Sequence, residues 1–153
     1  MRNSESKSKG FKPKQICELV DITQQTLRYW RENLYPSELR SFFNCDDVFI
    51  YHLIKAFVKG WDVDVKFLVN VNWLKLKQDL NSMSALEKKS TVAVYDKELK
   101  NISLYSLPNK LNLYDRRYRH VLIEDVMKDY NISFTKFGVT SSNIVPINEG
   151  VTL

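Results

Sequence analysis

The chain has 153 residues, of which 44% are hydrophobic and 27% charged, and its formal net charge of +5 is compatible with an anionic partner such as nucleic acid. This length suits one domain or two small ones, and the hydrophobic content excludes a chain without a core. Two cysteines do not make a disulfide framework, and with only two histidines beside them the sequence has no Cys/His cluster spaced for zinc.

Residues 1–10 open the chain with polar side chains and nothing to bury, so we expect a disordered arm. The arm lacks the apolar run of a signal peptide, and the whole sequence lacks the roughly 20 consecutive apolar residues that span a bilayer. The sequence therefore predicts no membrane partner and a cytoplasmic protein.

Two short helices are predicted at the start of the folded part. Pro13 suits the first turn of a helix, and the apolar residues after it stop at Asp21. Thr23 can cap a second helix that begins at once and runs to about Arg31. Two helices joined by about three residues form a helix-turn-helix, in which the first helix braces the second against a DNA groove.

The second of these helices separates an apolar side from a polar one. Leu27 and Trp30 fall on the apolar side, while the outward side carries glutamine and arginine, whose paired hydrogen-bonding groups match base edges in the major groove. A polar side is also what any solvated surface helix presents, and this interpretation stays open. The residues that we expect to contact DNA are Lys14, Thr23, Gln24, Gln25, Thr26, Arg28, Tyr29, Arg31 and Arg40.

The segment after this helix carries further signals. Arg40 lies in a short stretch that ends in two phenylalanines, and Asp46 or Asp47 can cap a third helix that runs to about Lys59. Gly60 then stands where a helix commonly ends on a left-handed residue. This order of elements predicts a short wing followed by a third helix.

The run from Thr26 to Trp30, together with the elements on either side of it, resembles the MerR family over about residues 11–68. Members of that family are winged helix-turn-helix transcription regulators that bind operator or promoter DNA as dimers. The resemblance implies a sequence-specific regulator that acts as a homodimer on an inverted-repeat site in double-stranded DNA, with the Arg40 wing on the flanking backbone or in the minor groove. Asp21 stands where the family's turn has glycine, and aspartate tolerates the left-handed backbone.

Residues 64–80 have the spacing of another helix with a broad apolar face. In the resembled family a helix in this place pairs with its twofold mate, so the resemblance implies a dimer contact here. The same face could instead pack inside the chain, and this alternative stays open. The residues that we assign to the dimer contact are Phe67, Leu68, Val71 and Leu74.

The second half of the chain changes to β-type patterns. Alternating β-branched and aromatic residues over 91–95 and 102–107 predict a hairpin. A basic patch that begins at Arg116 leads into an amphipathic helix ending near Asn131, and a strand is predicted over 132–139. The function of this half stays open, because nothing in it identifies a ligand site.

The predicted fold class is α+β, with an N-terminal winged helix-turn-helix, a connecting helix and a small C-terminal α+β region. Its segments are a disordered arm (1–10), the MerR-like winged helix-turn-helix (11–63), the connecting and dimerisation helix (64–90), the small α+β domain (91–140) and a tail (141–153). The DNA contacts are thus expected in the first half of the chain, and the dimer contact directly behind them.

Motifs for catalysis are missing from the sequence. It has no glycine-rich phosphate loop, no nucleophile elbow and no His-Glu metal motif, so we predict neither an enzyme nor a bound metal or cofactor. The leading hypothesis is a nucleoid-associated transcription regulator, and the sequence does not identify a small-molecule effector for it. Two alternatives stay open: an architectural DNA-binding protein of a mobile element, of the excisionase or partition type, and a protein-interaction module that has lost DNA binding.

Overall fold

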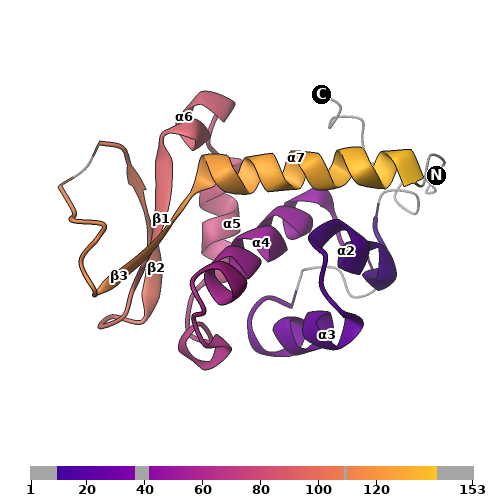
Figure 1. Ribbon diagram of the computed structural model, residues 1–153, viewed down its shortest axis with the longest axis horizontal. Helices are drawn as coiled ribbons and strands as arrows, with labels where there is room; N and C mark the ends of the chain where they lie inside the picture. Colours follow the sequence, from indigo (N-terminus) through magenta and orange to yellow (C-terminus); the bar gives the residue numbers. More distant parts are fainter. Residues whose placement is uncertain (1–9, 37–41, 109, 141–153) are drawn as a thin grey trace.

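The computed structural model describes residues 10–36, 42–108 and 110–140, and over these ranges it has a mixed α+β structure, which confirms the predicted class (Figure 1). Its helices are α2 (Pro13–Val20), α3 (Gln24–Asn33), α4 (Cys45–Lys55), α5 (Trp73–Asn81), α6 (Ala85–Lys89) and α7 (Ile123–Thr140). A π-helical turn, η1 (Ala56–Gly60), continues α4, and a 3-10 turn, η2 (Val65–Phe67), precedes α5. The strands are β1 (Thr91–Asp96), β2 (Asn101–Ser106) and β3 (Tyr118–Leu122). Residues 1–9 of the predicted arm and the predicted tail over 141–153 lie outside the described residues.

The first two helices form as the sequence predicts. Pro13 lies in the first turn of α2, and Asp21 ends this helix with φ 61° and ψ 57°, in the left-handed region expected for it. Thr23 caps α3, because its Oγ1 accepts a hydrogen bond from the amide of Thr26 at 3.0 Å. The turn between the two helices therefore consists of the residues from Asp21 to Thr23.

The two ends of α4 differ from the prediction. Asn44 is the N-cap, because its Oδ1 accepts from the amide of Asp47 at 2.9 Å while Asp47 Oδ2 accepts from the amide of Asn44 at 2.8 Å. Asp46 and Asp47 lie in the first turn instead, near the positive end of the helix dipole. We predicted a left-handed backbone at Gly60, but the residue that has it is Asp62, with φ 59°. The helix continues through the π turn η1 and ends at Gly60.

The helix predicted over 64–80 begins only at Trp73, so its first half is wrong. Asp64 and Asn72 each accept a backbone hydrogen bond that starts a new turn, and the second of these residues caps α5. The predicted dimer residues therefore share no single helix face. Leu68 and Val71 are buried inside the chain at 0% and 6% exposure, while Phe67 and Leu74 are exposed at 39% and 41%.

The three strands form one antiparallel sheet in the order β2-β1-β3. The predicted hairpin is confirmed as β1 and β2, in which Tyr95 pairs with Ile102. Residues 118–122, which we expected to lead into a helix, form β3 instead, with Arg119 opposite Tyr95. Strand β3 forms its ladder hydrogen bonds with the central strand β1. The formation of β3 therefore depends on residues more than 20 positions earlier in the chain, about which its own sequence says nothing.

Helix α7 extends further than predicted. We expected it to end near Asn131 and a strand to follow over 132–139, but the helix continues to Thr140, so the strand prediction is wrong. Phe134 and Phe137 place their ring centroids 5.6 and 6.0 Å from that of Phe11. Their spacing fits one side of a helix, and the contact with the start of the chain stabilises these last turns.

The hydrophobic core runs through both halves of the chain. Helix α7 contacts α2 and α4 on one side and reaches β1 and β3 at its start (Figure 1). The largest buried side chains include Trp30, Tyr51, Phe57 and Trp73. Buried residues of α2, α4, α5, β1 and α7 belong to one cluster. This cluster crosses the boundary predicted at residue 91 and gives α3 a rigid support.

Candidate nucleic-acid interface

Two buried side chains fix α3 against the core. Leu27 and Trp30 are 2% and 1% exposed, and the indole of Trp30 stacks on the ring of Tyr51 in α4, with the centroids 6.5 Å apart. Burial of these apolar groups sets the rotation of α3 about its own axis, because side chains repeat along a helix about every 3.6 residues. The opposite side of α3 is thereby turned to solvent.

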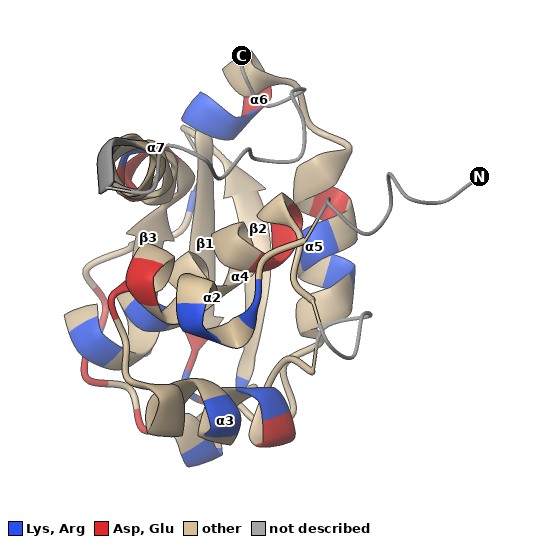
Figure 2. Ribbon diagram, turned by 90° about the vertical axis from the view of Figure 1, so that its right-hand side faces the viewer, with Lys and Arg blue, Asp and Glu red and all other residues tan. Residues whose placement is uncertain are grey.

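The outward side of α3 is polar. Gln24, Gln25, Arg28 and Glu32 are exposed on it, and Tyr29 is 50% exposed. Figure 2 shows this helix at one end of the molecule, with its basic segments in blue and its acidic segment in red. The outward side therefore combines amides, a guanidinium, a phenol and a carboxylate. Four of these five residues, namely Gln24, Gln25, Arg28 and Tyr29, were predicted to contact DNA, and Glu32 was not.

Three other residues predicted to contact DNA have structural contacts of their own. The hydroxyl of Thr23 caps α3 and donates to the hydroxyl of Thr26 at 3.0 Å. Arg31 is half-buried, with its guanidinium carbon 4.7 Å from the centroid of the Phe43 ring. These side chains shape and orient α3 more directly than they present groups to a ligand.

The last two predicted contacts, Lys14 and Arg40, are not residues of α3. Lys14 is exposed on α2, so its ammonium is accessible to an anion. Arg40 lies outside the described residues, and the wing that contains it stays a prediction.

Two hollows flank the outward side of α3, and Arg28 lines both of them. Gln24 and Pro13 help to line the first hollow, while Tyr29 and Lys59 help to line the second. Glu32 also lines both hollows, so a guanidinium and a carboxylate lie between them. Lys59 was not among the predicted contacts, because its position beside α3 depends on how η1 packs and no local sequence signal reports that packing.

The turn before α3 is tied to α4 by a lysine. Lys55 donates from Nζ to the carbonyl oxygen of Val20 at 2.8 Å, and the same ammonium lies 4.0 Å from the Asp21 carboxylate. That carboxylate is 98% exposed, so the ion pair contributes little and the backbone hydrogen bond is the main tie. Helix α3 is thus held through its buried side and through the turn that leads into it.

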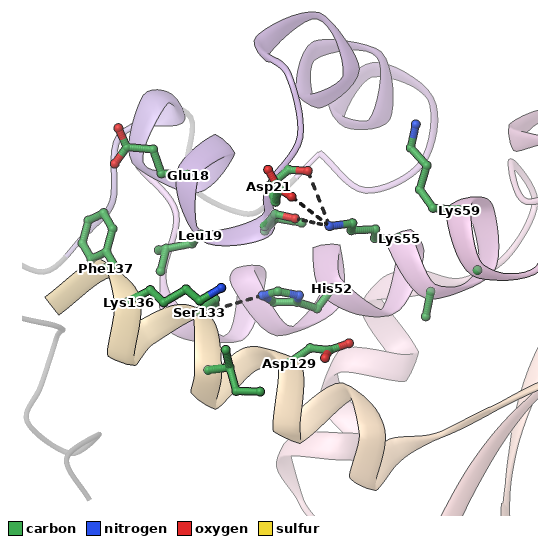
Figure 3. Close-up of a pocket in the computed structure, with 14 residues that line it drawn as sticks. Glu18, Leu19, Asp21, His52, Lys55, Lys59, Asp129, Ser133, Lys136 and Phe137 are labelled. Carbon is green, nitrogen blue, oxygen red and sulfur yellow. Dashed lines mark hydrogen bonds and ion pairs between the residues drawn. The ribbon is translucent and has the colours of Figure 1, made fainter. Parts of the chain in front are cut away.

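A groove of about 910 Å³ lies behind this turn, lined by residues of α2, α4 and α7 (Figure 3). Within it His52 is 8% exposed, and its Nε2 lies 3.1 Å from the Oγ of Ser133. The Ser133 hydroxyl donates to the Tyr130 carbonyl oxygen at 2.8 Å, so the His52 ring donates to Ser133. Burial and then Lys55 lower the pKa of His52 from 6.5 to about 4. A neutral His52 therefore joins α4 to α7 at pH 7.

The free energy of unfolding is expected to fall as the pH is lowered from about 7.5 to about 5, because the unfolded chain binds a proton at His52 more readily than the fold. The pKa of His52 is about 4 in the fold and near 6.5 in an unfolded chain. The stabilisation is complete well above pH 6.5 and decreases by about 2 kcal/mol by pH 5. Urea unfolding at both pH values measures this loss.

The control for this prediction is His52→Gln, which lacks the titrating ring. Its free energy of unfolding should change less than that of the wild type over the same pH range. Equal changes in the two proteins would contradict a neutral His52 at the contact between α4 and α7.

The described ranges contain no group of three or more His, Cys, Asp or Glu side chains that could hold a metal ion. Within the same residues, none of the helices combines the length and the hydropathy that a membrane crossing needs. No family model, no curated protein and no solved structure matches the chain.

Proposed function

We propose that this chain binds double-stranded DNA in a sequence-specific way, with α3 lying in the major groove, and that it regulates transcription by doing so. The observation that supports the proposal is the geometry of α3. Leu27 and Trp30 are buried, while Gln24, Gln25 and Arg28 are exposed on the outward side. An α-helix fits the major groove, where glutamine pairs with adenine and arginine with guanine through two hydrogen bonds each.

The neighbouring elements supply the support that such a helix needs. Lys55 of α4 bonds the end of α2 and so fixes the turn that leads into α3, and α2 takes the place of the bracing helix in a helix-turn-helix. Lys14 on α2 and Lys59 beside α3 are exposed cations that fit contacts to backbone phosphate. The resemblance to MerR regulators supports the regulatory role and a homodimer, for which Leu74 is exposed on the surface.

Selection of bound duplexes from a random pool, at two salt concentrations, tests the proposal. The wild-type chain is expected to enrich one sequence at both concentrations, and an inverted repeat would show that two copies bind with twofold symmetry. A variant with Gln24→Ala and Gln25→Ala changes only exposed side chains, so it should keep its far-UV circular dichroism and enrich the selected sequence less strongly. Wild-type binding without enrichment that disappears at moderate salt would overturn the proposal, because backbone attraction alone behaves in this way.

A further inference from the structure

Exposed cations continue from α3 along the surface toward the sheet. Lys59 and Val65 line the hollow beside α3, and Val65 is the first residue of η2. The ammonium of Lys66 lies 5.2 Å from the centroid of the Phe67 ring, and that of Lys100 lies 5.9 Å from the same centroid. Phe67 therefore connects the cations next to α3 with those of the β1–β2 turn, which comprises residues 97–100.

The β1–β2 turn borders a third hollow, separate from the two beside α3. Trp61 and Phe67 line it together with Lys97, Lys100 and Arg119, and its volume is about 250 Å³. Figure 1 shows the turn and α3 on the same lower side of the molecule, whereas α6 lies at the top, at the other end of β1. Because Val65 lines a hollow beside α3 and Phe67 lines the hollow at the turn, η2 borders both hollows.

Two acidic groups near the turn are engaged by other residues, whereas Asp62 and Asp64 are exposed and line the same hollow as the lysines. Glu98 lies 3.6 Å from the guanidinium of Arg117, which also bonds Asp96 at 2.8 Å. The hydrogen bond from Arg117 holds the pKa of the Asp96 carboxyl below its usual range, so this carboxylate stays charged and paired. Lys97 and Lys100 are exposed beside these pairs, and both line the hollow that η2 borders.

We propose that Lys97 and Lys100 form a second DNA contact, to phosphates that flank the groove entered by α3. This inference rests on the proposed function of α3 and extends its footprint across η2 to the β1–β2 turn. Phosphates line both edges of the major groove, so a protein that inserts one helix can reach flanking phosphates with cations on its neighbouring elements. Such contacts position the protein and carry no sequence information.

The test compares two double variants with equal loss of charge. Lys97→Gln with Lys100→Gln changes the turn and keeps the methylenes beside Phe67, while Lys88→Gln with Lys89→Gln changes exposed or half-buried lysines of α6 at the other end of β1. Each phosphate contact contributes about 0.9 to the slope of log affinity against log salt, so the turn variant should lose about 1.8. Between 50 and 200 mM salt its affinity should therefore fall roughly tenfold less than that of the wild type.

The α6 variant is expected to keep the wild-type slope, and both variants should select the same sequence as the wild type. A hydroxyl-radical footprint should shorten on one flank for the turn variant alone. A wild-type slope and footprint in the turn variant would overturn this inference and leave the proposal for α3 intact. Absence of any DNA binding by the wild type would overturn both.

Discussion

Replacement of Trp30 by alanine is expected to lower the free energy of unfolding by about 3–5 kcal/mol, the usual cost of removing a buried aromatic side chain. The indole is 1% exposed and stacks on Tyr51, so the substitution leaves a cavity between α3 and α4. A domain of this kind is stable by only about 5–15 kcal/mol, so the loss is a large share of the total. Urea unfolding of the two proteins measures the difference.

Tyr29→Ala is the matched control, because it removes an aromatic side chain from the adjacent position of the same helix. Tyr29 is 50% exposed, so its replacement should cost no more than about 1 kcal/mol. The two substitutions therefore distinguish the inner side of α3 from its outer side. Equal losses of stability would contradict the orientation of α3 on which the proposed DNA contact depends.

The first helices and the hairpin could be predicted because their signals are local. Pro13, Asp21 and Thr23 each act on the backbone within about one turn of their own position. The hairpin of β1 and β2 follows in the same way from alternation in two neighbouring runs. In both cases the hydrogen bonds that stabilise the element lie within it or across one turn.

The elements that were wrong depend on distant partners or on competing local signals. Residues 118–122 form a strand because β1 pairs with them, and the end of α7 is helical where Phe134 and Phe137 pack on Phe11. A short apolar run fits either a strand or a helix until such partners are known. Over 64–80, Asp64 and Asn72 are local signals for the start of a turn or helix. The prediction followed the apolar spacing instead and so joined two separate elements into one helix.

The candidate site could be predicted only in part. The helical period places Gln24 and Arg28 opposite Trp30, and the structure agrees. The same period leaves Arg31 near the edge of the polar side, where the ring of Phe43 determines its position. Lys59 lies beside α3 through tertiary packing, which local patterns do not report.

Replacement of Arg28 by alanine is expected to weaken specific DNA binding by about 1–3 kcal/mol, or roughly 5- to 150-fold. Arg28 is exposed and stands between the two hollows beside α3, so its guanidinium can reach a base edge without moving the helix. Its fork can pair with both O6 and N7 of one guanine, and loss of this pair should relax the preference at one base pair. Competition with duplexes altered at each position of the selected site measures both effects.

Lys14→Ala provides the comparison, because it also removes one exposed positive charge. A lysine on the bracing helix α2 fits phosphate and not bases, so binding to all sequences should fall evenly and the salt slope should decrease by about 1. The contrast between the two variants separates base contact from charge. If Arg28→Ala instead weakened all sequences equally, Arg28 would contact only the backbone, and the sequence preference of α3 would have to come from Gln24 and Gln25.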